Sequence, residues 1–317
     1  MTAGDAVTAG DAVTAGDAAP GDLLDISAEV AAALAAGRPV VALETTLVSH
    51  GFPGMRGLDV ALESERRVRA AGAVPATVAV MDGRIRVGAG AGELRRLAAS
   101  PHARKAGPRD LASCVAGGGL GATTVGGTLA VCRLAGIGFM GTGGIGGVHR
   151  GFAVTLDISA DLAQLARTQA VVVASGPKSL LDVPATAELL ESLAVPVLGW
   201  RTDTLPRFYT ASGGPAVSAR VETAAQAAQI ARLHWRLAGG GLLVARPPRR
   251  SLDLDELTQQ ALDAAQRAGA TGQAVTPAVL ARLHEATGGA TLEVNAELIA
   301  DNAGLAAELA VASAASG

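Results

Sequence analysis

Residues 169–178 read QAVVVASGPK, a Val-rich apolar run that ends in Ser-Gly-Pro and a lysine. Such a run, bounded by turn residues, is typical of a strand buried on both faces of a parallel sheet. Similar runs occupy 39–46, 137–142, 195–200 and 241–246. Helical patterns separate them, at about 57–71, 122–135, 158–167, 184–194 and 221–238. Strands alternating with helices predict a three-layer α/β/α fold with a mostly parallel central sheet.

The two ends of the chain differ from this pattern. Residues 2–19 are three near-copies of TAGDAV, so we expect 1–21 to be a disordered low-complexity tail. Residues 22–317 then form a single α/β domain. Within it, Ser27 is expected to cap a helix that runs through Ala36, and Asp82-Gly83 predicts a hairpin inside 76–88. Its end is a helical C-terminal segment, with helices expected at 254–268, 276–287 and 292–315.

Composition favours a small-molecule ligand over nucleic acid or membrane. Of 317 residues, 49% are hydrophobic but only 2% are aromatic, and the net charge is −3 without a basic block. Nucleic-acid binders need concentrated positive charge and often aromatic platforms. We find neither a membrane-spanning run nor a signal peptide, and two cysteines are too few for a disulfide framework. We therefore expect a cytoplasmic protein.

The basic residues are unusually biased towards arginine. Of 26 basic side chains, 24 are Arg and only two are Lys, Lys105 and Lys178. An amine can lose its proton and attack a carbonyl, whereas guanidinium stays protonated. Lys178 also follows the most apolar strand, where low-dielectric surroundings disfavour an ammonium ion. Lys178 is therefore the strongest catalytic candidate, although two lysines could also persist by chance at solvated positions.

Other polar residues follow predicted strands, where ligands collect in parallel α/β sheets. Glu44 ends an apolar strand, so it is either a desolvated proton donor or a structural carboxylate. His50, six residues later, is a weaker candidate. Thr123 and Thr124 begin a helix whose N–H groups could hold an anion, or they form a tight packing turn.

The segment 141–162 combines a glycine-rich loop with several polar residues. Five glycines precede His149, and such a loop lets the backbone approach a ligand closely. Asp157, Ser159 and Asp161 begin the next helix, where capping explains at least one of them. Asp157 also suits Mg²⁺ or Mn²⁺, which prefer oxygen ligands.

Near the C-terminus, Asn295 and Asn302 lie seven residues apart, on one helix face. Both could reach a ligand, or they could cap and pack against neighbouring backbone.

Together, these segments resemble the pseudouridine-5′-phosphate glycosidase family, which also includes the indigoidine-cluster protein A. The resemblance covers about residues 25–315, in the family's order. Its motifs are VALETTLVSHGFP, GAVPATVAVMDGRIRVG, KAGPRDL, GATTVGGT, TGGIGGVHRG, DISADL, SGPKSLLD, PATAELLESLAVPVLGW with RTDTLPRFY, and TPAVLARLHEATGG with LEVNAEL.

The resemblance implies a role for each matching position. Lys178 would be the nucleophile that forms an imine with C1′ of the opened ribose, and Glu44 would protonate the uracil carbon. Lys105 would bind the substrate phosphate. Asp157 would hold one Mn²⁺ per subunit. The remaining substrate contacts would be Thr124, Val125, His149, Ser159, Ala160, Asp161 and Asn295.

The implied reaction is reversible cleavage of pseudouridine 5′-phosphate to uracil and ribose 5-phosphate, by a homotrimer. A C-glycosidic bond lacks a heteroatom leaving group, so two-carboxylate glycosidase chemistry suits it poorly. Two alternatives are a Schiff-base sugar-phosphate lyase and a silent ribose-phosphate-binding protein. Protection by uracil would argue against the lyase. The binding protein would bind ribose phosphate without turnover, and Lys178→Ala would not impair it.

Three stretches depart from the family pattern. Gly107-Pro108 replaces the more usual Ser and basic residue, and YTASGG and RPPRRS are also atypical. These changes could alter the geometry of the phosphate loop or the surface charge, but they leave the proposed catalytic positions intact.

Overall fold

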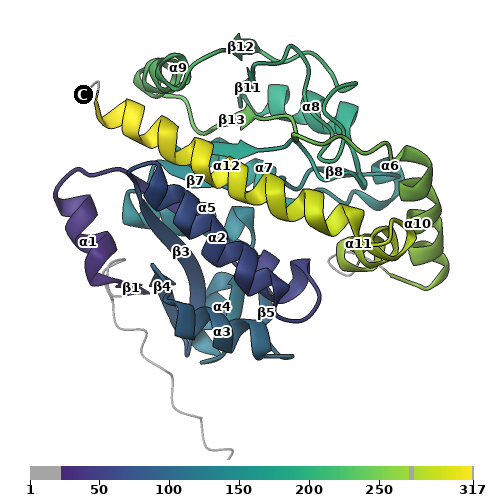
Figure 1. Cartoon of the computed structure of the whole chain (residues 1–317), viewed down its shortest axis with the longest axis horizontal. Coiled ribbons are helices and arrows are strands. Elements are labelled where there is room, and N and C mark those ends of the chain that lie inside the picture. Colours follow the sequence, from purple (N-terminus) through teal and green to yellow (C-terminus); the bar gives the residue numbers. More distant parts are fainter. Residues whose placement is uncertain (1–22, 271–274, 316–317) are drawn as a thin grey trace, which may run out of the picture.

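The computed structural model describes residues 23–270 and 275–315, so the predicted tail at 1–21 lies outside the described residues. Within these ranges the centre of the molecule is an 11-stranded sheet. Nine strands follow the order β1-β4-β3-β2-β7-β9-β13-β11-β12, and β6 joins β3 to β5. Only the pairs β3–β4 and β3–β6 are antiparallel in this sheet, as far as the described chain shows. The predicted mostly parallel α/β fold is therefore confirmed (Figure 1).

The strands of the main sheet are short. They are β1 (Leu24–Ile26), β2 (Val40–Leu43), β3 (Val74–Met81), β4 (Arg84–Val87), β5 (Arg104–Ala106), β6 (Gly121–Thr123), β7 (Phe139–Gly141), β9 (Val171–Ala174), β11 (Val197–Trp200), β12 (Ala219–Val221) and β13 (Leu242–Ala245). A separate antiparallel pair joins β8 (Val148–His149) to β10 (Leu181–Asp182).

Helices fill most of the connections. They are α1 (Ala28–Ala35), α2 (Arg56–Ala70), α3 (Ala91–Ala99), α4 (Leu111–Ala116), α5 (Val125–Ala135), α6 (Phe152–Thr155), α7 (Ala160–Arg167), α8 (Val183–Ser192), α9 (Ala224–Arg236), α10 (Asp255–Arg267), α11 (Val275–Ala286) and α12 (Ala290–Ala314), with a π-helix, η2 (Leu47–Gly51). No helix in the described ranges is long and apolar enough to cross a membrane.

Alternation along the central strands creates two separate cores. Val40 and Ala42 of β2 face one core with α1, α4, α5, α7 and α8. Val41 and Leu43 face the other core, with α2, α9 and α12. In Figure 1, α12 runs diagonally across the sheet beside α2, and these two helices pack together. Because both faces of the sheet are covered, its strands are apolar on both sides.

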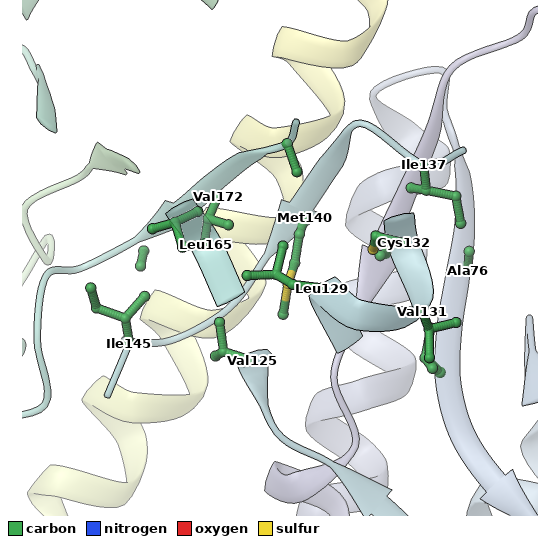
Figure 2. Packing of buried hydrophobic residues seen from close by; sticks show 14 of the residues in the cluster. Ala76, Val125, Leu129, Val131, Cys132, Ile137, Met140, Ile145, Leu165 and Val172 are labelled. Carbon is green, nitrogen blue, oxygen red and sulfur yellow. The ribbon is translucent and has the colours of Figure 1, made fainter. Parts of the chain in front are cut away.

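Aliphatic side chains, with only a few sulfur-containing ones, build the first core (Figure 2). Leu129 from α5, Leu165 from α7 and Met140 from β7 are fully buried there. On the opposite face, a Cβ added to Gly141 would lie 2.6 Å from the Ala303 Cα, so glycine allows α12 to pack directly on β7. Close approach of backbones thus compensates for the lack of aromatic side chains.

Local sequence signals placed several boundaries correctly. The Ser27 side chain accepts a hydrogen bond from the Val30 N–H and caps α1 as predicted. Asp82 and Gly83 both have positive φ, at 51° and 78°, and form the predicted hairpin turn between β3 and β4. The expected helix at 122–135 begins only at Val125, because 121–123 form strand β6.

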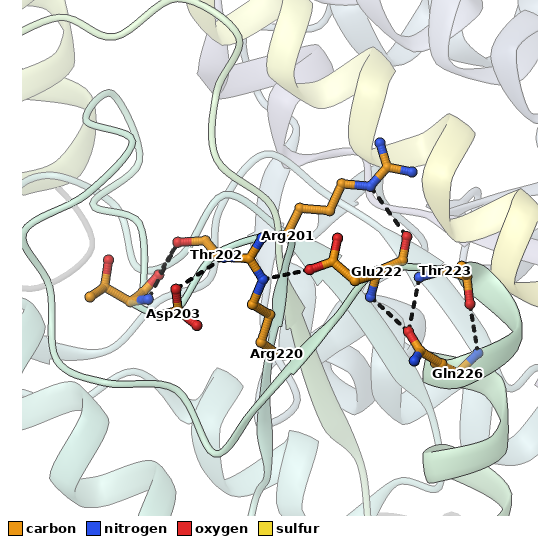
Figure 3. Close-up of polar contacts among 8 residues, drawn as sticks. Arg201, Thr202, Asp203, Arg220, Glu222, Thr223 and Gln226 are labelled. Atoms are coloured by element: carbon orange, nitrogen blue, oxygen red, sulfur yellow. Dashed lines mark hydrogen bonds and ion pairs between the residues drawn. The ribbon is translucent and has the colours of Figure 1, made fainter.

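At one edge of the sheet, β12 leads into α9 through a network of exposed polar contacts (Figure 3). The Thr223 hydroxyl accepts from the Gln226 N–H, and the Gln226 side chain accepts in return from the Thr223 N–H, which forms a capping box. Arg220 pairs with both Asp203 and Glu222. This edge therefore ends in solvent-facing ion pairs.

Candidate active site

A cavity of about 240 Å³, the central cavity, lies where the carboxyl ends of several strands meet. Glu44 follows β2, Thr124 follows β6 and Lys178 follows β9, while Lys105 lies within the short β5. β2 and β9 are parallel and end at this edge, whereas β6 runs back alongside β3 with β5 beside it and returns to the same edge, so residues far apart in sequence become neighbours.

Most of the predicted site residues line this central cavity. They are Glu44, Lys105, Thr124, His149, Asp157, Ser159, Ala160, Asp161 and Lys178. Asn295 lines a smaller adjoining pocket instead. The Val125 side chain lines neither cavity, because it is 1% exposed and packs in the first core (Figure 2). Any contact from Val125 to a ligand must therefore use its backbone.

Glu44 is a buried acid. It is 6% exposed, and burial raises the pKa of its carboxyl group. The positive charge of Lys178 and a 2.5 Å hydrogen bond from the Thr142 hydroxyl oppose that shift. A carboxyl group whose pKa is raised by desolvation can carry a proton near neutral pH and donate it.

Both lysines lie at the same cavity wall. Burial lowers the pKa of Lys105, and the positive charge of Lys178 lowers it further. Asp161 and Glu44 act in the opposite direction. Among the described residues, no carboxylate lies within ion-pairing distance of either ammonium group. The two amines are therefore positioned for a ligand.

Asp161 joins two backbone segments of the site. Its Oδ1 accepts from the Gly126 N–H at 2.7 Å, and its Oδ2 accepts from the Gly146 N–H at 2.8 Å. A Cβ added to Gly146 would lie 2.2 Å from the Ser159 hydroxyl, so the glycine allows this close approach. The carboxylate thus fixes the N-terminus of α5 against the glycine-rich loop.

The N-terminus of α5 faces the cavity through Thr124. The Thr124 hydroxyl caps the helix by accepting from the Gly127 N–H at 3.1 Å. The Val125 N–H, unlike that of Gly126, makes no hydrogen bond to the part of the chain that the structure describes. Free N–H groups at a helix N-terminus attract anions, so this site suits a phosphate group.

Asp157 and His149 form a possible cation site. The His149 Nδ1 lies 3.9 Å from the Asp157 Oδ2. No cluster of three or more His, Cys, Asp or Glu side chains suited to a metal occurs in the described residues. Both Asp161 oxygens accept from backbone N–H groups, so of the two aspartates in this segment Asp157 is the one free to hold an ion. Mn²⁺ or Mg²⁺ fits only with water or ligand oxygens completing its coordination.

A second, smaller pocket of about 60 Å³, the apolar pocket, adjoins the central cavity. Glu44, Lys105 and Lys178 line both spaces. The walls of the apolar pocket include Leu47, Phe52, Phe208, Leu280 and Ile299.

Two buried polar atoms of the apolar pocket, Asn295 Oδ1 and His50 Nε2, have no partner among the described residues. Asn295 itself is 4% exposed. The pocket therefore suits a flat molecule with a few polar edge atoms.

Asn302 has the other role considered for this pair of asparagines. Its side chain donates to the Thr142 carbonyl at 2.8 Å and to the Ser175 hydroxyl at 3.1 Å. It therefore ties α12 to the ends of β7 and β9, while Asn295, seven residues earlier, faces the pocket.

Sequence reasoning missed Asp110 and Thr46, which both line the central cavity. The Asp110 Oδ2 accepts from the Gly107 N–H at 3.1 Å and closes a turn over Gly107-Pro108. That Gly-Pro-x-Asp turn signal was available in the sequence. Pro108 lies against α5, since a Cβ on Gly126 would come within 3.0 Å of its ring. The atypical Gly107-Pro108 therefore shapes the cavity wall beside the N-terminus of α5.

Comparison with known proteins agrees with this architecture. The family model described as indigoidine synthase A like protein matches residues 29–312, and the chain belongs to this family. A Streptomyces griseus relative named pseudouridine-5′-phosphate glycosidase is 50% identical over 296 residues, covering 91% of this chain and 92% of the relative. A Geobacillus kaustophilus protein of the same name is 44% identical, covering 91% and 98%.

Two solved structures share the fold. The prealnumycin C-glycosynthase AlnA, solved with ribulose 5-phosphate, has a TM-score of 0.85 and 39% identity, covering 93% of this chain and 98% of that one. An indigoidine synthase A-like protein from Thermotoga maritima has a TM-score of 0.83 and 34% identity, covering 91% and 96%.

Proposed function

We propose that this chain is a pseudouridine-5′-phosphate glycosidase that cleaves its substrate reversibly to uracil and ribose 5-phosphate. The observation that carries the proposal is the meeting of Lys178, Lys105 and Glu44 at the boundary of the two adjoining pockets. The central cavity offers cations and helix N–H groups for a sugar phosphate. The apolar pocket offers flat walls and the free Asn295 oxygen for a base.

Lys178 supplies the nucleophile. Opening the ribose breaks the C1′–O4′ bond, and the neutral amine adds to C1′. The nitrogen lone pair then forms the C1′–N imine as the bond from C1′ to the uracil carbon breaks, and that bond's electrons leave with the uracil. Water hydrolyses the imine, which frees ribose 5-phosphate and restores the amine.

Glu44 supplies the proton for the uracil carbon. Burial raises its pKa, which favours the protonated form, and it lines both pockets. In the reverse reaction the resulting carboxylate takes the proton from uracil. The Thr142 hydroxyl orients the Glu44 carboxyl group through the hydrogen bond that it donates to it.

Lys105 and the α5 N-terminus bind the phosphate in this proposal. The Lys105 ammonium comes from β5, and the adjacent β6 leads through Thr124 into α5, whose N-terminus offers the free Val125 N–H and the helix dipole. His149, Asp157, Ser159 and Ala160 line the same cavity. Asp161 acts by holding both loops in place, because its oxygens are occupied by backbone N–H groups.

Asp157 would hold the Mn²⁺ that we propose as the cofactor, with His149 beside it. A divalent ion bound there would supply positive charge to substrate oxygens. We further propose that the protein forms a homotrimer, as the family resemblance implies, and that it is cytoplasmic.

A second candidate activity is formation of the same kind of bond. The solved relative AlnA is described as a C-glycosynthase, and the imine step runs in either direction. A sugar-phosphate lyase is less well supported, because such an enzyme has no need of the apolar pocket next to the lysine.

The test is uracil release from pseudouridine 5′-phosphate with Mn²⁺, by wild type and by Lys178→Ala. Borohydride added during turnover should trap a ribose-phosphate adduct on Lys178, visible by mass spectrometry. Uracil and adduct from wild type, with neither from the variant, support the reaction and the nucleophile. Absence of uracil from folded, metal-loaded wild type removes the glycosidase function. Release that persists in Lys178→Ala removes the imine mechanism.

A further inference from the structure

Another cavity of about 320 Å³, the rear cavity, adjoins the lysine loop, which is the segment 175–180 that carries Lys178. Its walls come from the end of the glycine-rich loop, the segment after Lys178, residues 207–210 and the first turn of α10. Leu181 lines both the rear and the central cavity. The rear cavity is therefore separate from the proposed catalytic site but shares a wall with it.

Three hydroxyl groups in this cavity have no partner. The Tyr209 hydroxyl, the Thr258 Oγ1 and the Ser179 Oγ are buried and unbonded within the described residues. Tyr209 and Thr258 are each 1% exposed. A buried hydroxyl without a partner destabilises the folded protein. Three such groups around one space point to a polar ligand that satisfies them.

The charges in the cavity favour an anion. Arg150 donates to the Gln259 Oε1 at 2.8 Å and to the Ser179 carbonyl at 3.4 Å, but no carboxylate pairs with it in the described chain. Arg207, by contrast, is neutralised by Asp255 at 2.7 Å.

The other carboxylate of the rear cavity, Asp182, caps α8 by accepting from the Ala185 N–H. The N-terminus of α10 also faces the cavity, through Leu254, Asp255 and Thr258. Asp182 keeps its negative charge, so the attraction for an anion is local: Arg150 has no carboxylate partner among the described residues, and the N-terminus of α10 faces the same space.

We propose that the rear cavity is a second binding site for a phosphate group, held by Arg150 and by the hydroxyls of Tyr209, Thr258 and Ser179. Free phosphate and a small phosphate ester share this chemistry, and the space admits either. The site is distinct from the phosphate position at Lys105 and does not depend on the proposed glycosidase reaction.

Occupancy would act on the lysine loop. Ser179 follows Lys178 directly and lines the rear cavity, its hydroxyl is buried without a partner among the described residues, and its carbonyl accepts from Arg150. A phosphate that fixes Arg150 and the Ser179 hydroxyl therefore fixes the backbone carrying the nucleophile. Bound phosphate should change the rate of turnover without competing with substrate.

The test is calorimetric titration of Lys105→Met with inorganic phosphate and, separately, with glycerol 3-phosphate. Lys105→Met weakens the site at the α5 N-terminus and leaves the rear cavity intact. Tyr209→Phe with Thr258→Val, placed on the Lys105→Met background, removes two hydroxyls with almost no change of shape. Ser192→Ala on the same background is the control, because that hydroxyl is exposed and bonds only to the Glu188 carbonyl.

We expect Lys105→Met and its Ser192→Ala control to bind one phosphate per chain, and the Tyr209→Phe/Thr258→Val form to bind at least about tenfold more weakly. The tighter of the two probes identifies the source of the phosphate group. Binding that is absent in Lys105→Met, or unchanged in the hydroxyl variant, overturns the proposal. Circular dichroism and the thermal midpoint check folding, and removal of unbonded hydroxyls should not lower that midpoint.

Discussion

The edge of the sheet that carries the lysines and the edge that carries β12 use charge in opposite ways. At β12, Arg220 is 43% exposed and pairs with Asp203 and Glu222, which are both more than half exposed (Figure 3). At the central cavity, Glu44 is buried, and Lys105 and Lys178 are in no ion pair within the described residues.

The difference separates charge that keeps the surface polar from charge reserved for a ligand. Exposed pairs contribute about 0–1 kcal/mol each, because water screens them. Buried groups without a partner cost stability, and such groups cluster at functional sites. At these two edges, Arg220 serves the first purpose, and we assign Lys105 and Lys178 to the second.

The largest effect is expected when Lys178 of the active site is replaced by arginine, the cation that forms the surface ion pairs. Lys178→Arg keeps the positive charge but replaces an amine that can deprotonate with a guanidinium that cannot. We expect uracil release to fall by about 10⁴-fold or more, as for loss of a covalent nucleophile. Steady-state assay of pseudouridine 5′-phosphate cleavage measures it. Activity of Lys178→Arg within tenfold of wild type would show that charge alone suffices there.

Glu44→Gln removes the buried acid and nearly preserves its shape. We expect turnover to fall by about 10²- to 10⁴-fold, the usual contribution of a general acid. Assays with saturating substrate should show the loss in kcat rather than in KM. A loss confined to KM would instead assign Glu44 to substrate binding.

The stability of the same variant should depend on pH. Burial raises the folded pKa of Glu44 above its ordinary value of 4.5, so the folded protein holds a proton that the unfolded chain releases. The Glu44 contribution is thus most favourable below about pH 4.5 and is lost as pH rises through the folded pKa. Glu44→Gln should become more stable relative to wild type as pH rises from 4.5 to 8 in urea unfolding.

Asp161→Asn tests the carboxylate that organises the site without donating a proton. Asparagine has one acceptor oxygen, so the N–H of Gly126 or of Gly146 loses its partner. We expect a loss of about 1–3 kcal/mol in unfolding free energy and a smaller fall in activity than for Glu44→Gln. Urea denaturation measures the unfolding free energy, and steady-state kinetics, including KM for substrate, measure the activity. Unchanged stability would show that the clamp is dispensable.

Glu65 is the matched control for Glu44. Burial raises its carboxyl pKa as well, and the Thr77 hydroxyl donates to it at 2.5 Å, but it lines none of the three cavities described above. Glu65→Gln should show the same sign of pH-dependent stability change and leave uracil release unchanged. A tenfold loss of activity would mean that Glu65 also contributes to catalysis, and Glu44 would then not be distinguished from it by its place in the cavity.

The smallest effect is expected at the other edge. Arg220→Gln breaks two exposed ion pairs and should change the unfolding free energy by less than about 1 kcal/mol, with no effect on catalysis. Urea unfolding at low and high salt measures it, and salt should reduce the difference between variant and wild type. A larger loss would place this network among the structural elements of the fold.

The sequence by itself determined the local structure. Apolar Val-rich runs, the Ser27 cap and the Asp82-Gly83 turn each act within a few residues, so periodicity and turn chemistry were enough to place them. The scarcity of lysine pointed to Lys105 and Lys178 for the same reason, since an amine differs chemically from guanidinium wherever it lies. Three-residue strands such as β5 and β6 carry too short a pattern to recognise.

Tertiary structure alone decided which polar groups meet. Asn295 and Asn302 occupy one helix face, yet only packing of α12 against β7 and β9 sends one to the pocket and the other to backbone carbonyls. The Asp161 carboxylate links Gly126 to Gly146, and the three hydroxyls of the rear cavity come from residues distant in sequence. Their burial and hydrogen bonding depend on how strands and helices are brought together, and no local pattern encodes that.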